Sequence, residues 1–586
     1  MLDLNREYIL PETGLPDIND LLGEGERMSN SVNLGTCPFL TSNDVESESE
    51  YKLLRSSERK IMLHSQIGYR SFAKTKLAYS KIHEHIEAVG YLVDRYGICL
   101  DWSMGYPASL RANMPKGTGL ILNKKQNFID LTHSAPVAPH FGDFVIGTPA
   151  AVENTIAALE AGSTSIGNIG QFFTFRLPKW NNDVKTTTET VKAIILCANQ
   201  PVTIMIHSNL DDGFAALFYD MSCSIGAVLI EQYIIETLLK GHVSHCYGHT
   251  FSDPLTRLAF QKVLSTVAIT PGTMVYGNTT IFVANEVENY ANLASYLLVD
   301  IIAQHKSPTG HGLNPVPVTE AMRIPEIKEI IDAHLFANRL ILRADGFLDL
   351  FDMTAVEKTA KMLVKGGKRF KTQVLRGLDE AGIDIKNPFE LLLSIRRIGA
   401  KTLEELFGPG KPQEDLIRGR KPIVQATPIA ELEKRSVKIV LDLKQKEIPQ
   451  TRFKICVACT DVHEYGKILV EEVLKRLNYE IIDAGVSVDP DIVAKRAKET
   501  DADYIAISTY NGIALSYLQS LNHEMSQLGL NIPIFIGGKL NQIPDDSSTS
   551  LPVDVTSELK TMGAVVCHRV EDMLETILKM TKEEEL

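Results

Sequence analysis

The residues best suited to chemistry are Asp461 and His463, which stand between an apolar run at 455–458 and a helix-like run at 467–477. In an Asp-x-His sequence the carboxylate can hydrogen-bond one imidazole nitrogen and leave the other nitrogen to bind a metal ion. Gly466 follows at the helix start, where the lack of a side chain lets backbone or ligand approach closely. A capped helix with an exposed histidine has the same local pattern, so the motif alone leaves both interpretations open.

The elements around this motif predict its setting. Five short apolar runs alternate with helix-like runs, and each ends in small or polar residues; they span 455–458, 480–483, 504–508, 534–536 and 564–567. This alternation predicts a flavodoxin-like (Rossmann-type), doubly wound α/β sheet with a ligand cleft at the carboxyl ends of its strands. His463 would therefore be displayed at this ligand-binding edge, and Thr509-Tyr510-Asn511-Gly512 and Gly537-Gly538 follow the third and fourth strands at the same edge.

The order Asp-x-His-x-x-Gly, then Ser508-x-Tyr510, then Gly537-Gly538 resembles the cobalamin-binding domain of adenosylcobalamin mutases and methionine synthase. In that family the histidine is the lower ligand of cobalt, and the nucleotide tail of the cofactor enters the sheet. The resemblance implies adenosylcobalamin as cofactor, His463 as cobalt ligand and Asp461 as its hydrogen-bond partner. It also implies a cofactor-binding set made up of Gly466, Ser508, Tyr510, Gly512, Gly537 and Gly538. Tyr510 departs from the family, whose Ser-x-Leu motif has Leu at this position.

Composition excludes several classes of protein. The chain has 586 residues, 44% of them apolar, which is enough for about two to four domains with large cores. A net charge of −13 argues against a nucleic-acid partner. Eight scattered cysteines fit a reducing compartment, and we expect the cytoplasm. No signal-like pattern opens the sequence, and Glu231 and Gln232 interrupt its most apolar stretch, 225–239, so no membrane span is expected.

The first half of the chain predicts a (β/α)₈ barrel of the TIM type. Eight strand candidates occur, at 97–102, 128–132, 163–167, 202–207, 225–230, 243–247, 273–276 and 304–307. Helix-like runs lie between them, at 149–161, 186–198, 255–267 and 287–302. The fifth candidate is ambiguous, because 225–239 could equally form one buried helix.

These patterns predict four domains. Residues 1–70 are rich in Asn, Ser, Glu and Gly and are predicted to form an N-terminal arm. Residues 71–376 would form the catalytic barrel with flanking helices, 377–450 a helical linker, and 451–586 the cobalamin-binding domain. A breaker cluster at 407–412, Phe-Gly-Pro-Gly-Lys-Pro, falls within the linker.

In a barrel, catalytic residues are expected just after each strand. These positions contain Arg111, Arg176, His133 and Lys306 but few carboxylates, which favours an anionic substrate. Arg111 and Arg176 would each bind a carboxylate bidentately, and Lys306 would lie near the substrate or the adenosyl ribose.

Residues 90–325 also resemble the catalytic barrel of glutamate mutase, through Gly147-Thr148-Pro149, the run 238–248 and Lys306-Ser307-Pro308. That family has a glutamate after the third strand to receive the substrate ammonium, whereas this chain has Ile166-Gly167-Asn168 there. The resemblance therefore implies an isomerase, a radical carbon-skeleton mutase, whose small dicarboxylic substrate has no amino group. The interconversion of 2-methyleneglutarate and 3-methylitaconate fits this description. We also expect a homo-oligomer.

Two rival functions remain open from the sequence. The nearest is a mutase of another acid, including glutamate (methylaspartate) mutase. The second is a corrinoid methyltransferase, in which the cobalamin domain would carry methyl groups to a partner. A cobalamin sensor without catalytic activity would leave the large barrel unexplained.

Overall fold

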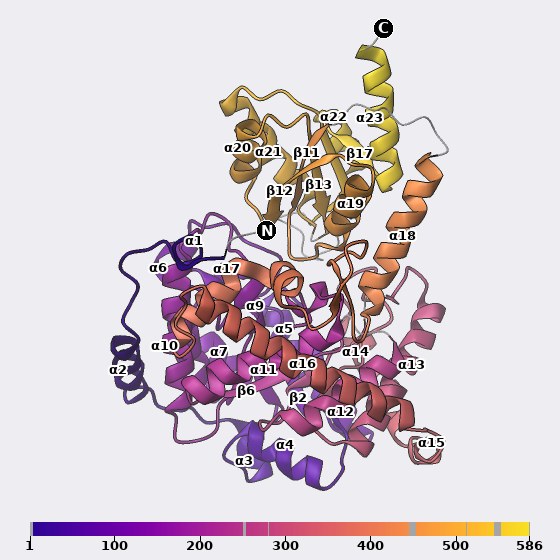
Figure 1. Ribbon diagram of the computed structural model, residues 1–586. Helices are drawn as coiled ribbons and strands as arrows, with labels where there is room; N and C mark the ends of the chain where they lie inside the picture. Colours follow the sequence, from indigo (N-terminus) through magenta and orange to yellow (C-terminus); the bar gives the residue numbers. More distant parts are fainter. Residues whose placement is uncertain are drawn as a thin grey trace. The chain divides into compact units, whose positions relative to one another are not determined.

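The computed structural model describes residues 4–249, 253–278, 281–444, 453–510, 512–543 and 553–584 (Figure 1). The chain divides into two compact units. The N-terminal unit comprises Met1–Thr174 and Asn182–Thr427, and the C-terminal unit comprises Phe175–Asn181 and Pro428–Leu586.

Eight parallel strands form the core of the N-terminal unit, in the order β6-β5-β4-β3-β2-β1-β8-β7. A parallel bridge between Tyr247 and Val275 joins the two ends of the sheet, so the strands close into a barrel. The strands are β1 (Met62–Ile67), β2 (Arg95–Ile98), β3 (Ala138–Phe141), β4 (Ser165–Ile166), β5 (Met205–Asn209), β6 (His242–Cys246), β7 (Met274–Val275) and β8 (Gly312–Leu313). The predicted (β/α)₈ fold is confirmed.

Helices follow the strands in sequence. They are α5 (Phe72–Ala88), α7 (Lys125–Thr132), α8 (Ala151–Glu160), α10 (Asp183–Ala198), α11 (Met221–Gln232), α12 (Pro254–Val267), α13 (Glu286–Lys306) and α14 (Ile327–Ile341). Local signals start several of them. The Asp253 side chain accepts a hydrogen bond from the Thr256 backbone N–H, and Pro254 occupies the first turn of α12.

Three of the predicted strands were wrong. Residues 128–132 belong to α7, 225–230 to α11, and 304–307 to the end of α13 and its C-cap. The strands β3 and β8 were missed because they are short and contain Pro139, His140 or Gly312, so they form no apolar run. Strand β1 lies within 1–70, the range predicted as an arm.

The barrel interior is polar at its base. Helix α4 (Glu48–Ser57) places two charged side chains there, and both are almost fully buried. Glu48 Oε1 lies 2.8 Å from Arg95 Nε, and Lys52 Nζ donates hydrogen bonds to the carbonyls of Thr273 and Gly310 at 2.9 and 2.8 Å. Buried ions persist only when they are paired, so part of the predicted arm belongs to the barrel core.

Two long helices follow the barrel, α16 (Thr354–Glu380) and α17 (Pro388–Phe407). Helix α16 packs against α11 through glycines: a Cβ added at Gly226 would lie 2.4 Å from the Phe370 ring, and one at Gly367 would lie 2.7 Å from Ile225. Helix α18 (Thr427–Lys444) comes next. The predicted linker, 377–450, thus contains the end of α16, α17 and α18, and its last six residues lie outside the described ones.

The C-terminal unit has a five-stranded parallel sheet in the order β12-β11-β13-β14-β17. Its strands are β11 (Lys454–Cys459), β12 (Glu480–Val486), β13 (Tyr504–Thr509), β14 (Ile534–Gly538) and β17 (Val565–Cys567). Its helices are α19 (Tyr465–Arg476), α20 (Pro490–Glu499), α21 (Ala514–Leu528), α22 (Thr556–Thr561) and α23 (Val570–Glu584). The strand order 2-1-3-4-5 is that of a flavodoxin-like sheet, as predicted.

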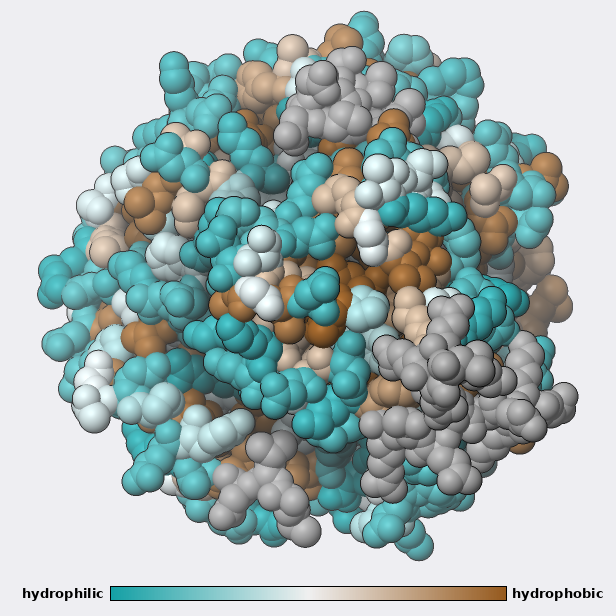
Figure 2. Space-filling model, turned by 90° about the horizontal axis from the view of Figure 1, so that it is seen from above, coloured by the Kyte–Doolittle hydropathy of each residue, from teal (hydrophilic) through white to brown (hydrophobic). Residues whose placement is uncertain are grey.

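The surface seen in Figure 2 is dominated by hydrophilic residues, with apolar ones gathered in smaller areas. Among the described residues, no helix has the length and apolar composition needed to cross a membrane.

Candidate functional site

The Asp461–His463 pair lies in the loop between β11 and α19, at the carboxyl end of β11, which pairs with β12 on one side and β13 on the other. His463 Nδ1 is 2.8 Å from Asp461 Oδ1, which also accepts the His463 backbone N–H at 2.9 Å. Asp461 Oδ2 accepts the Tyr510 backbone N–H at 3.0 Å and the Thr460 hydroxyl at 3.1 Å. The carboxylate thus connects the β11–α19 loop to the residue after β13.

The electrostatics of Asp461 set the tautomer of His463. The carboxyl is only 3% exposed, and burial alone would raise its pKa. Hydrogen bonds from the His463 side chain, the His463 backbone N–H and the Thr460 hydroxyl oppose burial, and the pKa of Asp461 is lowered. An ionised Asp461 accepts the proton on Nδ1, so Nε2 of the neutral imidazole has the lone pair that a metal ligand needs.

Tyr510 packs against the His463 imidazole. The ring centroids are 4.5 Å apart with an interplanar angle of 32°, and Lys539 Nζ lies 4.3 Å from the Tyr510 ring centroid. The structure therefore brings Asp461, His463 and Tyr510 together.

The glycines at the strand ends of this sheet lie where other parts of the chain approach too closely for a side chain. A Cβ at Gly466 would lie 2.6 Å from Ser508 Oγ. Gly538 has φ +105°, and a Cβ there would lie 2.2 Å from the Thr509 carbonyl. The other two predicted glycines are also closely packed, Gly512 against Ile543 and Gly537 against the Cys567 carbonyl. A histidine ligand with a carboxylate partner and small residues at neighbouring strand ends fits a large flat cofactor with a tail.

Comparison with known families decides the cofactor class. Residues 455–557 match the model of the B12 binding domain family. The C-terminal unit contains a B12-binding domain. This match supports a cobalamin cofactor.

Solved structures also match part of the chain, among them a cobalamin-binding protein from Desulfitobacterium hafniense DCB-2. The match to that protein has 17% identity, covers 26% of this chain and 70% of that chain, and has a TM-score of 0.20.

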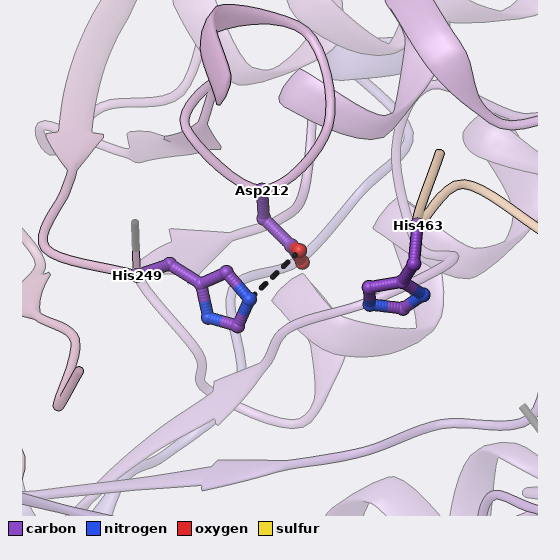
Figure 3. A group of neighbouring side chains, drawn as sticks. All are labelled: Asp212, His249 and His463. Carbon is purple, nitrogen blue, oxygen red and sulfur yellow. Dashed lines mark ion pairs between the residues drawn. The ribbon is translucent and has the colours of Figure 1, made fainter. Parts of the chain in front are cut away.

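In the barrel, several polar residues follow the carboxyl ends of the strands. Asp143 follows β3, Asp211 and Asp212 follow β5, and His249 follows β6. Asp211 Oδ2 accepts the backbone N–H groups of Gly248 and His249, both at 2.9 Å. Asp212 Oδ1 is 3.5 Å from His249 Nε2 (Figure 3). This edge of the barrel contains more carboxylates than the sequence indicated.

The pKa of Asp143, at this edge, is strongly raised. Burial raises the pKa of its carboxyl, the nearby charge of Asp212 raises it further, and a hydrogen bond with Asn168 opposes both, to give a pKa of about 7. A carboxyl that changes charge near neutral pH in a barrel mouth is a candidate functional group.

Arg111 and Arg176 both follow barrel strands but are held differently. Arg111 ends α6 (Ala108–Arg111), and its Nη2 donates to the carbonyls of Met104 and Tyr106 at 3.1 and 3.2 Å. It also contacts the Asn154 side chain at 3.3 Å. Arg176 belongs to residues 175–181, which group with the C-terminal unit. The two residues therefore fall in different units, and the structure does not define a shared carboxylate clamp.

His133 and Lys306 were assigned to the wrong end of the barrel. His133 is the C-cap of α7, and its Nε2 contacts the Thr36 carbonyl at 2.9 Å; Lys306 is the last residue of α13 and is exposed. Each helix leads into the amino end of the next strand, opposite the edge where barrel chemistry occurs. The error follows from interpreting 128–132 and 304–307 as strands.

Asp143 and Asp212 were missed as candidate residues. Asp143 was hidden because β3 was not recognised, although the sequence His140-Phe141-Gly142-Asp143 has a polar residue just after a strand.

Proposed function

We propose that the protein is an adenosylcobalamin-dependent carbon-skeleton mutase, an isomerase acting on a small dicarboxylic acid. The observation that supports it best is the Asp461–His463 pair at the end of β11 in a B12-binding domain, on a chain that also contains a closed (β/α)₈ barrel. Bound adenosylcobalamin supplies radical chemistry through cleavage of its cobalt–carbon bond.

Residues of the chain would bind the cofactor and hold the substrate. His463 would bind cobalt through Nε2, and Asp461 would hold the imidazole in the required tautomer and orientation. Residues after the barrel strands would hold the substrate, as in other barrels of this type. Their tasks are to orient the acid and to keep water out.

The substrate predicted from the sequence, 2-methyleneglutarate converted to 3-methylitaconate, is one of two candidates. Its support was the apparent absence of a carboxylate after the third strand. Asp143 follows the actual third strand, β3, so that argument no longer holds. Glutamate is therefore a second candidate, favoured by Asp143 with Asp212, which could receive a substrate ammonium.

The test is turnover. The protein with adenosylcobalamin is incubated separately with 2-methyleneglutarate and with glutamate, and products are followed by NMR. Formation of 3-methylitaconate alone supports the first candidate, and methylaspartate alone supports the second. If neither acid isomerises while methyl groups pass from methylcobalamin to an acceptor, the rival corrinoid methyltransferase is correct.

We further propose a cytoplasmic protein that forms homo-oligomers. Gel filtration with light scattering tests the second part.

A further inference from the structure

Residue 510 contacts both members of the Asp461–His463 pair. Its backbone N–H donates to Asp461 Oδ2 at 3.0 Å, and its ring lies against the imidazole at a centroid distance of 4.5 Å. The side chain is 44% exposed, so it is not a core residue that happens to touch the pair. Its position is instead set by its contacts with Asp461 and His463.

A cation holds the Tyr510 ring. Lys539 Nζ lies over the ring, 4.3 Å from its centroid, and Lys539 is itself exposed. Cation–π attraction of this kind lowers the freedom of the phenol ring and polarises its electrons. The Lys539 ammonium thus contacts the Tyr510 ring, and the Tyr510 ring contacts one face of the His463 imidazole.

The geometry is compatible with metal binding. A metal bound by Nε2 lies in the plane of the imidazole, so a ring against one face leaves the coordination direction open. The interplanar angle of 32° is closer to a stacked than to an edge-on arrangement. A stacked ring restricts rotation of the imidazole about its side-chain bonds and so fixes the plane in which the metal must lie.

We propose that Tyr510 is a positioning residue for cobalamin: its ring fixes the plane of the His463 imidazole, and Lys539 holds that ring in place. This inference rests on His463 being the cobalt ligand. Leucine, which the related motif has at this position, can pack on an imidazole but cannot attract Lys539. The Lys539–Tyr510–His463 contact is therefore a feature of this chain.

The experiment uses the full-length protein and cob(II)alamin made by reducing hydroxocobalamin. Variants are Tyr510→Leu, Tyr510→Phe and Lys539→Met, the last of which keeps an apolar side chain of similar length. Two quantities are measured: the dissociation constant by anaerobic equilibrium dialysis, and, in protein whose histidine rings are labelled with ¹⁵N, the fraction of cobalt whose electron paramagnetic resonance shows the two-line nitrogen splitting of a histidine ligand rather than the three-line splitting of the cofactor's own base. Neither quantity depends on turnover.

We expect Tyr510→Phe to behave as wild type, because it keeps the ring. Tyr510→Leu should weaken binding about two- to tenfold and lower the fraction with nitrogen splitting. Lys539→Met should weaken binding about two- to fivefold in the wild-type background and should have no effect in the Tyr510→Leu background.

Unchanged binding and splitting in Tyr510→Leu would overturn the proposal. Tighter binding in Tyr510→Leu would also overturn it, since Tyr510 would then obstruct the cofactor. The experiment distinguishes failure of this inference from failure of the proposed function. If nitrogen splitting depends on Tyr510 but the protein isomerises no acid, this inference stands and the mutase proposal is wrong.

Discussion

His463 Nδ1 lies 2.8 Å from Asp461 Oδ1 in the loop between β11 and α19. Both oxygens of that carboxylate accept hydrogen bonds, and burial leaves it 3% exposed. Each oxygen faces at least one backbone N–H group, so no other side chain of this size satisfies the same donors.

Replacing Asp461 by Asn should weaken cobalamin binding. Either amide orientation places an NH₂ group against an N–H donor, from His463 on one side or Tyr510 on the other. Loss of such a partner to a metal-binding histidine typically costs about 10- to 100-fold in affinity. Equilibrium dialysis with hydroxocobalamin measures the change. Asp501→Asn, at an exposed turn of the same unit, is the control and should bind as wild type; equal affinities for both variants would refute the role given to Asp461.

Replacing Gly466 by Ala should destabilise the B12-binding domain and weaken binding, because the new methyl group would lie 2.6 Å from Ser508 Oγ. Overpacking of this kind costs about 1–3 kcal/mol. Ser508 Cβ is 3.7 Å away, an ordinary contact, so the double variant with Ser508→Ala should regain most of the lost stability. Thermal unfolding of both variants checks this. Gly346→Ala, where a Cβ meets no atom within 4 Å, serves as control; a double variant no better than Gly466→Ala would exclude the proposed clash.

Replacing Arg111 by Met should lower the thermal stability of the barrel. The guanidinium holds the carbonyls of Met104 and Tyr106, and hydrogen bonds from charged groups contribute about 1.5–3 kcal/mol. Arg369→Met, an exposed position on α16, should leave the melting temperature unchanged. Wild-type stability together with a raised KM would instead show that Arg111 serves as a substrate clamp.

Asp143 should make barrel stability pH-dependent. Its pKa is about 7 in the folded protein, above the unfolded value of about 3.9. Between these values the folded state holds a proton that the unfolded state has lost, so this group's stabilising contribution, present at low pH, is lost as pH rises towards 7. Melting temperatures of Asp143→Asn and wild type, compared from pH 5 to 8, should diverge with rising pH in favour of the variant.

Asp212→Asn provides the control for this prediction. Removing the Asp212 charge should lower the pKa of Asp143 and move the divergence to lower pH. If the melting temperatures of Asp143→Asn and wild type differ by the same amount at every pH from 5 to 8, Asp143 has an ordinary pKa.

The sequence predicted both folds and the Asp461–His463 site, because each depends on local pattern. Alternating apolar runs defined the small sheet. Asp461 and His463 are only two positions apart, so the carboxylate can reach the imidazole whatever surrounds them. Barrel residues were harder to assign. Strands such as β8, Gly312–Leu313, are two residues long, and their position depends on neighbouring strands rather than on their own apolar content.

The stack of Tyr510 on His463 could not have been predicted from the sequence, although both residues were singled out. It depends on how far β13 extends beyond β11, a register that only the folded sheet defines. The same is true of Glu48 and Lys52, whose burial in the barrel base follows from the path of α4.

The most direct test of the central claim is electron paramagnetic resonance of protein-bound cob(II)alamin, prepared with ordinary histidine and with histidine labelled with ¹⁵N in the imidazole ring. Coordination by His463 predicts a three-line nitrogen splitting that becomes two-line on labelling, and labelled His463→Ala should show no two-line splitting. A wild-type splitting that is insensitive to the label, or a two-line splitting that persists in labelled His463→Ala, would show that the ligand nitrogen does not come from His463.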